Sequence, residues 1–203
     1  MRLNRSFFER DTLNVARELL GNVLVCETPE GTTRGVITET EAYLGELDDA
    51  AHSYKGKTER VRALYGEKGV VYIYLIYGKY YCLNFSTGPA GVPECVLIRA
   101  LEPVSGVELM MKRRGQRDIA ALCSGPGKLC MAMGLTKEHY GESLCRPNSR
   151  VYIEAGKAPE RIEQTPRIGI DYAEKCREKP WRFVAKDAEK CRRACKNVPG
   201  MEK

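Results

Sequence analysis

The chain has 203 residues, of which 43% are hydrophobic and 30% are charged, with a formal net charge of +6. This length and composition fit one globular domain and exclude a disordered chain. The longest apolar run, residues 70–77, is too short to span a bilayer, and the charged N-terminus lacks the apolar core of a secretory signal. We therefore expect an intracellular protein with no membrane contact.

The basic excess is divided between the C-terminal end and the rest of the chain. Residues 186–203 contain six Lys or Arg and three Asp or Glu, a net charge of +3, so the preceding residues carry the other +3. This charge is compatible with a nucleic-acid partner but is common among proteins in general. We predict one domain over residues 1–185 and a basic, cysteine-containing tail over 186–203.

The nine cysteines form no C-x-x-C motif, and most lie in apolar or helical stretches. A reduced thiol in such a place behaves as a small hydrophobic group. Cys176, Cys191 and Cys195 could cluster and hold a metal, although their spacing matches no established metal-binding pattern. We expect reduced cysteines, no metal and no organic cofactor.

Hydrophobic periodicity predicts a mixture of helices and strands. In chain order, the predicted elements are a helix over 13–20 capped by Asp11 or Thr12, strands over 23–26 and 32–43, a long polar loop over 44–69 with one helical turn, strands over 70–77, 80–86 and 95–100, helices over 104–114 and 128–133, and short strands over 151–154, 167–171 and 182–184. The order shows neither a βαβ alternation nor a repeat. This favours a single α+β domain, a curved and mostly antiparallel sheet with surrounding helices and a protruding β-hairpin.

Charged residues that could carry chemistry lie on two of these strands. Glu39, Glu41 and Tyr43 alternate along one strand and therefore share a face, where burying two carboxylates is costly unless a site or a partner uses them. A solvated edge strand would explain them equally well. Arg99 ends an apolar strand and is expected to meet a carboxylate or a phosphate, or to form an ordinary ion pair.

Tyrosines concentrate in the predicted hairpin. Five of the eleven tyrosines fall within residues 72–81, around a turn predicted at Gly78 and Lys79. A hairpin with Tyr77 and Lys79 at its tip could place an aromatic wedge beside a phosphate contact, since tyrosine stacks well on bases. Ordinary strand propensity also explains a tyrosine-rich segment.

These clusters resemble the alkyladenine (3-methyladenine) DNA glycosylase family. The resemblance runs from Phe7 to Val184 in the family's order, and its segments are ETEAYLG at 39–45, AAHS at 50–53, YIYLIYGKYYCLN at 72–84, CVLIRALEP at 95–103, LCSGPGKLC at 122–130, RIGI at 167–170 and KPWRFV at 179–184. It implies an enzyme that flips alkylated or deaminated purines out of duplex DNA and hydrolyses their N-glycosidic bond, with no lyase activity.

The resemblance also implies a role for individual residues. Glu41 is the general base that activates a water molecule, while Arg99 and the backbone carbonyl of Ile168 help to hold that water. The flipped base lies among four residues, and a fifth, Tyr77, fills the gap left in the duplex. The four residues around the base are Tyr43, His52, Tyr74 and Asn84, the last of which disfavours normal guanine. Candidates for contacts with the DNA backbone are Arg60, Lys79 and Lys128.

Two positions depart from the family pattern beside the implied pocket, Val61 in place of the usual Asn and Leu64 in place of the usual Met. The resemblance implies 3-methyladenine, 7-methylguanine, hypoxanthine and ethenoadenine as substrates, a monomer, and a location in the cytoplasm with the nucleoid or in the nucleus. One alternative is a non-catalytic nucleic-acid-binding module of related fold. Another, a carbohydrate glycosidase using Glu39 and Glu41, leaves the tyrosine hairpin without a role.

Overall fold

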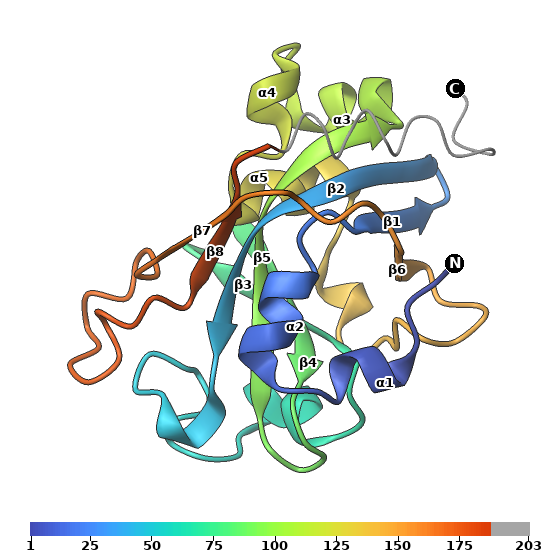
Figure 1. Cartoon of the computed structure of the whole chain (residues 1–203). Coiled ribbons are helices and arrows are strands. Elements are labelled where there is room, and N and C mark those ends of the chain that lie inside the picture. The colour runs from blue at the N-terminus through green and yellow to red at the C-terminus, as the bar shows by residue number, and fades with distance from the viewer. Residues whose placement is uncertain (188–203) are drawn as a thin grey trace.

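One antiparallel sheet organises the chain, and the computed structural model describes residues 1–187 of it (Figure 1). Six strands follow one another across the sheet in the order β3-β4-β5-β2-β1-β6, while β8 pairs with both β2 and β7. The strands are β1 (Val23–Thr28), β2 (Gly31–Tyr43), β3 (Val71–Ile76), β4 (Tyr80–Thr87), β5 (Glu94–Ser105), β6 (Val151–Glu154), β7 (Ile162–Thr165) and β8 (Arg182–Ala185).

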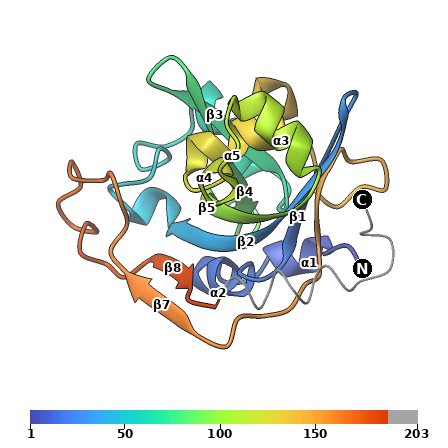
Figure 2. The same ribbon diagram turned by 90° about the horizontal axis from the view of Figure 1, so that it is seen from above.

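The sheet is strongly curved because its longest pair is irregular. The pairing of β2 with β5 shifts register between Arg34 and Gly35 and again on both sides of Glu39. Such bulges increase the local twist and bend the strand. Figure 2 shows the sheet curled around α3, α4 and α5, with α1 and α2 on its outer side. The fold is therefore α+β with a curved antiparallel sheet, as predicted.

The helices are short. They are α1 (Arg5–Phe8), α2 (Thr12–Glu18), α3 (Val107–Arg114), α4 (Ile119–Leu122) and α5 (Pro126–Met133), with 3-10 segments η1 (Gly45–Leu47), η2 (Glu59–Tyr65) and η3 (Lys137–His139). Asp11 caps α2 by accepting a 2.9 Å bond from Asn14 N–H. The buried hydroxyl of Thr40 donates to the carbonyl of Ala16 and so ties α2 to β2. None of the helices within residues 1–187 is long and apolar enough to cross a membrane.

Three predicted elements differ from the observed ones. Strand β5 continues to Ser105, which pairs with Arg34, so α3 begins at Val107 rather than at Val104. Residues 167–171, predicted as a strand, form bends and a turn, and the strand of this region is β7. The long segment after β2 contains η1 and η2 instead of one helical turn. Of the predicted tail, only Lys186 and Asp187 lie within the described residues.

Strands β3 and β4 are joined by a tight turn with an unusual backbone. The amide of Lys79 donates to the carbonyl of Ile76, and both intervening residues have positive φ angles, 51° at Tyr77 and 63° at Gly78. Among the described residues, Tyr77 is the one non-glycine residue with a positive φ. An aromatic residue in this conformation is strained, and strain of this kind is typical of functional sites.

Candidate active site

A cavity of about 330 Å³ opens where β2, β3, β4 and β5 meet the loops that follow β2 and precede β8. It brings together most of the residues that the sequence singled out. Its walls are formed by Tyr43, Ala50, Ala51, His52, Ser53, Leu64, Tyr72, Tyr74, Ile76, Tyr77, Cys82, Asn84, Cys95, Leu97, Arg99, Pro126, Ile168, Gly169, Ile170 and Tyr172. This volume lies at the lower end of the range for small-molecule sites, and the walls are largely aromatic and apolar.

The carboxylate of Glu41 lies directly behind this wall and is fully buried. Its Oε2 accepts a 2.9 Å hydrogen bond from the Tyr43 hydroxyl, and its Oε1 accepts a 2.8 Å bond from the Ile168 amide. Arg99 Nη1 lies 3.3 Å from the same Oε1. All three partners line the cavity, so the one fully buried carboxylate of β2 points toward it.

Burial raises the pKa of Glu41 above its ordinary value, because the charged form loses its hydration. The Arg99 guanidinium, the Ile168 amide and the Tyr43 hydroxyl each oppose this effect. Burial and the neighbouring Glu41 charge raise the pKa of Tyr43, so its hydroxyl keeps the proton that it donates. The result is a carboxylate with a raised proton affinity whose ionised form is held by oriented donors.

Glu39 has a different role from Glu41. Its Oε1 accepts hydrogen bonds from Arg99 Nε at 2.9 Å and from Arg182 Nε at 2.6 Å. Glu39 therefore holds the guanidinium that in turn faces Glu41, and it does not line the cavity. The prediction that Glu39 and Glu41 share a strand face is confirmed by their common partner Arg99.

Aromatic rings form the opposite wall. The His52 and Tyr74 rings meet edge to face with centroids 4.5 Å apart, and His52 Nδ1 lies 2.8 Å from the Tyr72 hydroxyl. Desolvation by these rings, together with the Arg60 charge, lowers the pKa of His52 to about 4. The Arg60 guanidinium carbon lies 5.2 Å from the centre of the Tyr74 ring. At neutral pH this wall is therefore aromatic, with His52 uncharged.

Asn84 is a buried lining residue of the cavity, and its Nδ2 donates to the carbonyls of Tyr72 and Cys82. These two bonds fix the plane of the amide. Val61 and Leu64, the two departures from the family pattern, are both buried and pack with Tyr72 in one apolar cluster. They therefore act as apolar support for the aromatic wall, and Leu64 is itself part of the wall.

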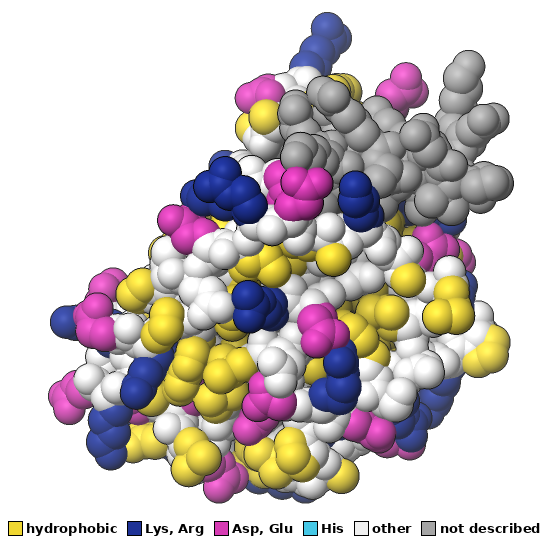
Figure 3. Space-filling view, in the orientation of Figure 1, with side chains coloured by type: hydrophobic (Ala, Val, Ile, Leu, Met, Phe, Trp, Pro, Cys, Tyr) yellow, Lys and Arg dark blue, Asp and Glu magenta, His cyan; other side chains and the backbone are white. Residues whose placement is uncertain are grey.

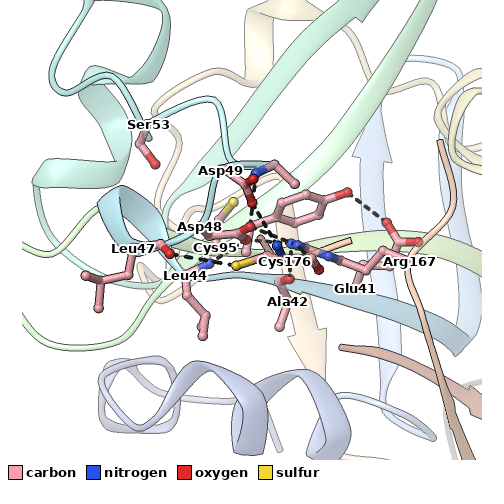
Figure 4. A network of polar contacts seen from close by, with 12 residues as sticks. Glu41, Ala42, Leu44, Leu47, Asp48, Asp49, Ser53, Cys95, Arg167 and Cys176 are labelled. Carbon is pink, nitrogen blue, oxygen red and sulfur yellow. Dashed lines mark hydrogen bonds and ion pairs between the residues drawn. The ribbon is translucent and has the colours of Figure 1, made fainter. Parts of the chain in front are cut away.

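Sequence reasoning missed a buried ion pair between Arg167 and Asp48, which is drawn in Figure 4. Two guanidinium nitrogens of Arg167 bond the two carboxylate oxygens of Asp48, at 2.5 and 2.8 Å, and both side chains are completely buried. Removing one partner of such a pair typically costs roughly 3–5 kcal/mol, because it leaves an uncompensated charge. Asp48 stands shortly before AAHS, and Arg167 directly before IGI, but nothing in the sequence pairs these two positions.

Asp48, Asp49 and Cys176 form a group of possible metal ligands, with donor atoms within 4.8 Å of one another. However, Asp48 is bonded by Arg167, and Asp49 accepts three backbone N–H bonds from residues 174–176. The group is therefore organised as a hydrogen-bond network, and we assign no metal to it. Cys191 and Cys195, the other residues of the possible metal cluster, lie outside the described residues.

Of the candidate DNA contacts, Tyr77 lines the cavity and Arg60 lies against the ring of Tyr74 in its wall. Tyr77 is 91% exposed, as predicted, and Lys79 follows it in the same turn. Lys128, on the first turn of α5, donates from its ammonium to the hydroxyl of Ser124, and the same helix contributes Pro126 to the cavity. On the face in Figure 3, Lys and Arg side chains are interspersed with Asp and Glu.

The environment of His52 leads to a prediction for its titration. Because the folded protein disfavours the imidazolium, we expect the His52 ring signals in NMR to titrate with a midpoint of about 4, more than two units below an ordinary histidine. Comparison with His52→Gln assigns the signals. A midpoint near 6.5 would contradict the desolvated wall described above.

Comparison with known proteins agrees with this geometry. The sequence model of the family described as methylpurine-DNA glycosylase (MPG) matches residues 6–189. Relatives named provisionally as 3-methyladenine DNA glycosylases include one from Methanocella arvoryzae (47% identity, 92% of this chain and 93% of the relative) and one from Clostridium novyi (46% identity, 93% and 96%). A third, from Desulfitobacterium hafniense, is 46% identical over 93% of this chain and 97% of its own length. The chain therefore belongs to the methylpurine-DNA glycosylase family of DNA repair enzymes.

Proposed function

We propose that this glycosylase hydrolyses the N-glycosidic bond of alkylated or deaminated purines flipped out of duplex DNA, with Glu41 as the general base. The observation that carries the proposal is the buried Glu41 carboxylate behind an aromatic cavity. The candidate substrates are 3-methyladenine, 7-methylguanine, hypoxanthine and ethenoadenine. The direct test is base release from a panel of duplexes that each carry one of these lesions.

The hydrogen bonding of Glu41 supports its role as the base. A carboxylate offers about four acceptor positions, and three donors occupy positions on Glu41. The remaining position on Oε2 suits a water molecule. In this proposal Arg99 and the carbonyl of Ile168 also contact the water, which Glu41 deprotonates as it attacks the sugar C1′.

The aromatic walls support a purine as the occupant. Tyr43 and the His52/Tyr74 side would stack on the two faces of the base, and an alkylated purine that carries a positive charge gains cation–π attraction from such rings. An uncharged His52 does not repel that cation. A cationic base is also a good leaving group, so for it the protein need supply only the water and its activation. A neutral base such as hypoxanthine must in addition take up a proton as it leaves.

The lining of the cavity supports simple hydrolysis without strand cleavage. A lyase step needs an amine that attacks the sugar, and no lysine is among the lining residues. The buried Lys68 lies near Leu64, but its ammonium donates to the carbonyls of Leu64 and Val92 and does not line the cavity.

A non-catalytic nucleic-acid-binding module is the alternative. Such a module would need the exposed Tyr77 and the aromatic cavity, but it would not need a fully buried carboxylate held by three donors. Burying that charge has a free-energy cost that binding alone does not offset. The set around Glu41 therefore favours catalysis.

Glu41→Gln is expected to abolish base release while leaving lesion-DNA binding nearly unchanged, because the amide keeps the shape but cannot accept the proton. Glu39→Gln is the matched control and should lose far less activity, since Glu39 only holds Arg99 and Arg182. Single-turnover excision and binding assays measure both effects. Equal losses of activity in the two variants would show that the roles of Glu41 and Glu39 are wrongly assigned.

Asn84→Ser is expected to relax discrimination against guanine, because the smaller side chain leaves room for the 2-amino group. Release of undamaged guanine, relative to release of hypoxanthine, measures the change. The lost bonds to Tyr72 and Cys82 predict some loss of stability as well, so thermal unfolding is measured in parallel. A guanine rate no higher than that of the wild type would remove Asn84 from substrate selection.

Tyr77→Ala is expected to weaken binding to lesion DNA by about 1–3 kcal/mol, the scale of one lost base-stacking contact. Stability should hardly change, because an exposed side chain leaves no cavity. Tyr77→Gly serves as the control for backbone strain, since glycine adopts a positive φ without cost: it should be at least as stable as Tyr77→Ala and equally impaired in binding. Wild-type binding by both variants would refute a wedge at this position.

A further inference from the structure

The segment that carries Ile168 is held by side chains rather than by a sheet. Residues 166–179 form no strand, yet the amide of Ile168 must lie within 2.8 Å of Glu41 Oε1. Asp49 binds one end of the segment through the amides of residues 174–176. Arg167 holds the other end, directly beside Ile168.

The guanidinium of Arg167 contacts both parts of the site. Besides its two bonds to Asp48, it donates to the carbonyl of Ala42, the residue between Glu41 and Tyr43, at 2.9 Å. Its central carbon lies 4.5 Å from the centre of the Tyr43 ring. Figure 4 shows Arg167 between the strand end at Ala42 and the loop that bears Asp48.

We propose that Arg167 and Asp48 are positioning residues of the glycosylase, which hold the Ile168 amide and the Tyr43 ring in place around Glu41. Asp48 fixes the guanidinium in two directions, and it also accepts the amide protons of Leu44 and Ala50. The guanidinium then fixes the strand end and the Ile168 segment relative to each other. This inference rests on the proposed role of Glu41.

Loss of this arrangement should change the ionisation of Glu41. The groups that act on the carboxylate are Arg99 and Tyr43, the Ile168 amide, and the more distant charge of Arg167 itself, all of which lower its pKa against the effect of burial. The other ionisable groups nearby are Glu39, bonded to Arg99, and Cys82 and Tyr172 of the cavity wall. A displaced Ile168 amide raises the pKa of Glu41. A missing Arg167 charge raises it too, although removal of the Asp48 charge in the same variant offsets this second effect in part. A base is active when ionised, so the acidic limb of the pH–rate profile should move to higher pH.

The test compares the wild type with the double variant Arg167→Gln/Asp48→Asn, which removes both charges and leaves no unpaired ion. We expect single-turnover release of hypoxanthine at pH 7 to fall about 10- to 100-fold, with the acidic limb displaced to higher pH. Lesion-DNA binding should weaken less, about threefold. Folding of each variant is followed by the fluorescence of Trp181, the chain's single tryptophan. The Trp181 ring lies 5.0 Å from the Arg167 guanidinium and therefore senses the same part of the structure.

Arg113→Gln is the matched control, because Arg113 has a similarly buried side chain that bonds Glu30, Thr28 and the Ala132 carbonyl away from the cavity. It should lose stability without a shift of the acidic limb. Arg167→Lys keeps the charge but not the two-pronged geometry, and should show the same shift to a smaller extent. If the double variant does not fold, the acidic limb of Arg167→Lys tests the positioning role instead.

The inference is overturned if a folded double variant, or Arg167→Lys, keeps the wild-type acidic limb, or if Arg113→Gln shifts the limb as far. Failure of the proposed function looks different, since the wild type itself would then release no base. An active wild type with an unaffected Arg167→Lys variant removes only the positioning role of Arg167 and Asp48.

Discussion

The burial of one carboxylate is the constraint on which the rest of this structure depends. An ionised Glu41 away from water is stable only if oriented donors replace its hydration. The protein supplies them from three places in the chain, Tyr43, Arg99 and Ile168. Each donor needs its own support, and Glu39, Arg182, Asp48 and Arg167 provide it. Many of the buried polar contacts of the fold therefore hold this one carboxylate, either directly or through one of its donors.

The bulges of β2 are the backbone feature that makes this arrangement possible. Register shifts around Glu39 let the strand pair with β5 and β8 while Thr40 faces α2 and Glu41 faces the cavity. A regular strand would remain flatter, and the aromatic wall of β3 and β4 would lie further from the end of β2. The curvature of the sheet and the enclosure of the site are thus two results of the same local irregularity.

Sequence patterns predicted the parts of this protein in which a local rule decides the structure. The alternation of Glu39, Glu41 and Tyr43 and the exposed Tyr77 followed from strand periodicity and turn chemistry, and the family resemblance named the other cavity residues. The Arg167–Asp48 pair was missed because its partners lie far apart in the chain and no periodic pattern connects them. Residues 167–171 were predicted as a strand because Ile168 and Ile170 alternate with other residues. In the structure this alternation belongs to an irregular segment that side chains hold in place.

The wide separation of the Glu41 donors in the chain has a consequence for synthesis. During translation the N-terminal part emerges first, and Glu41 and Tyr43 leave the ribosome long before Ile168 and Arg167. Strand β8, which pairs with the Glu39–Glu41 part of β2, comes later still. The set of donors around Glu41 is therefore incomplete until residues 167 and 168 have been synthesised. Docking of this late segment against β2 completes both the sheet and the hydrogen bonding of Glu41.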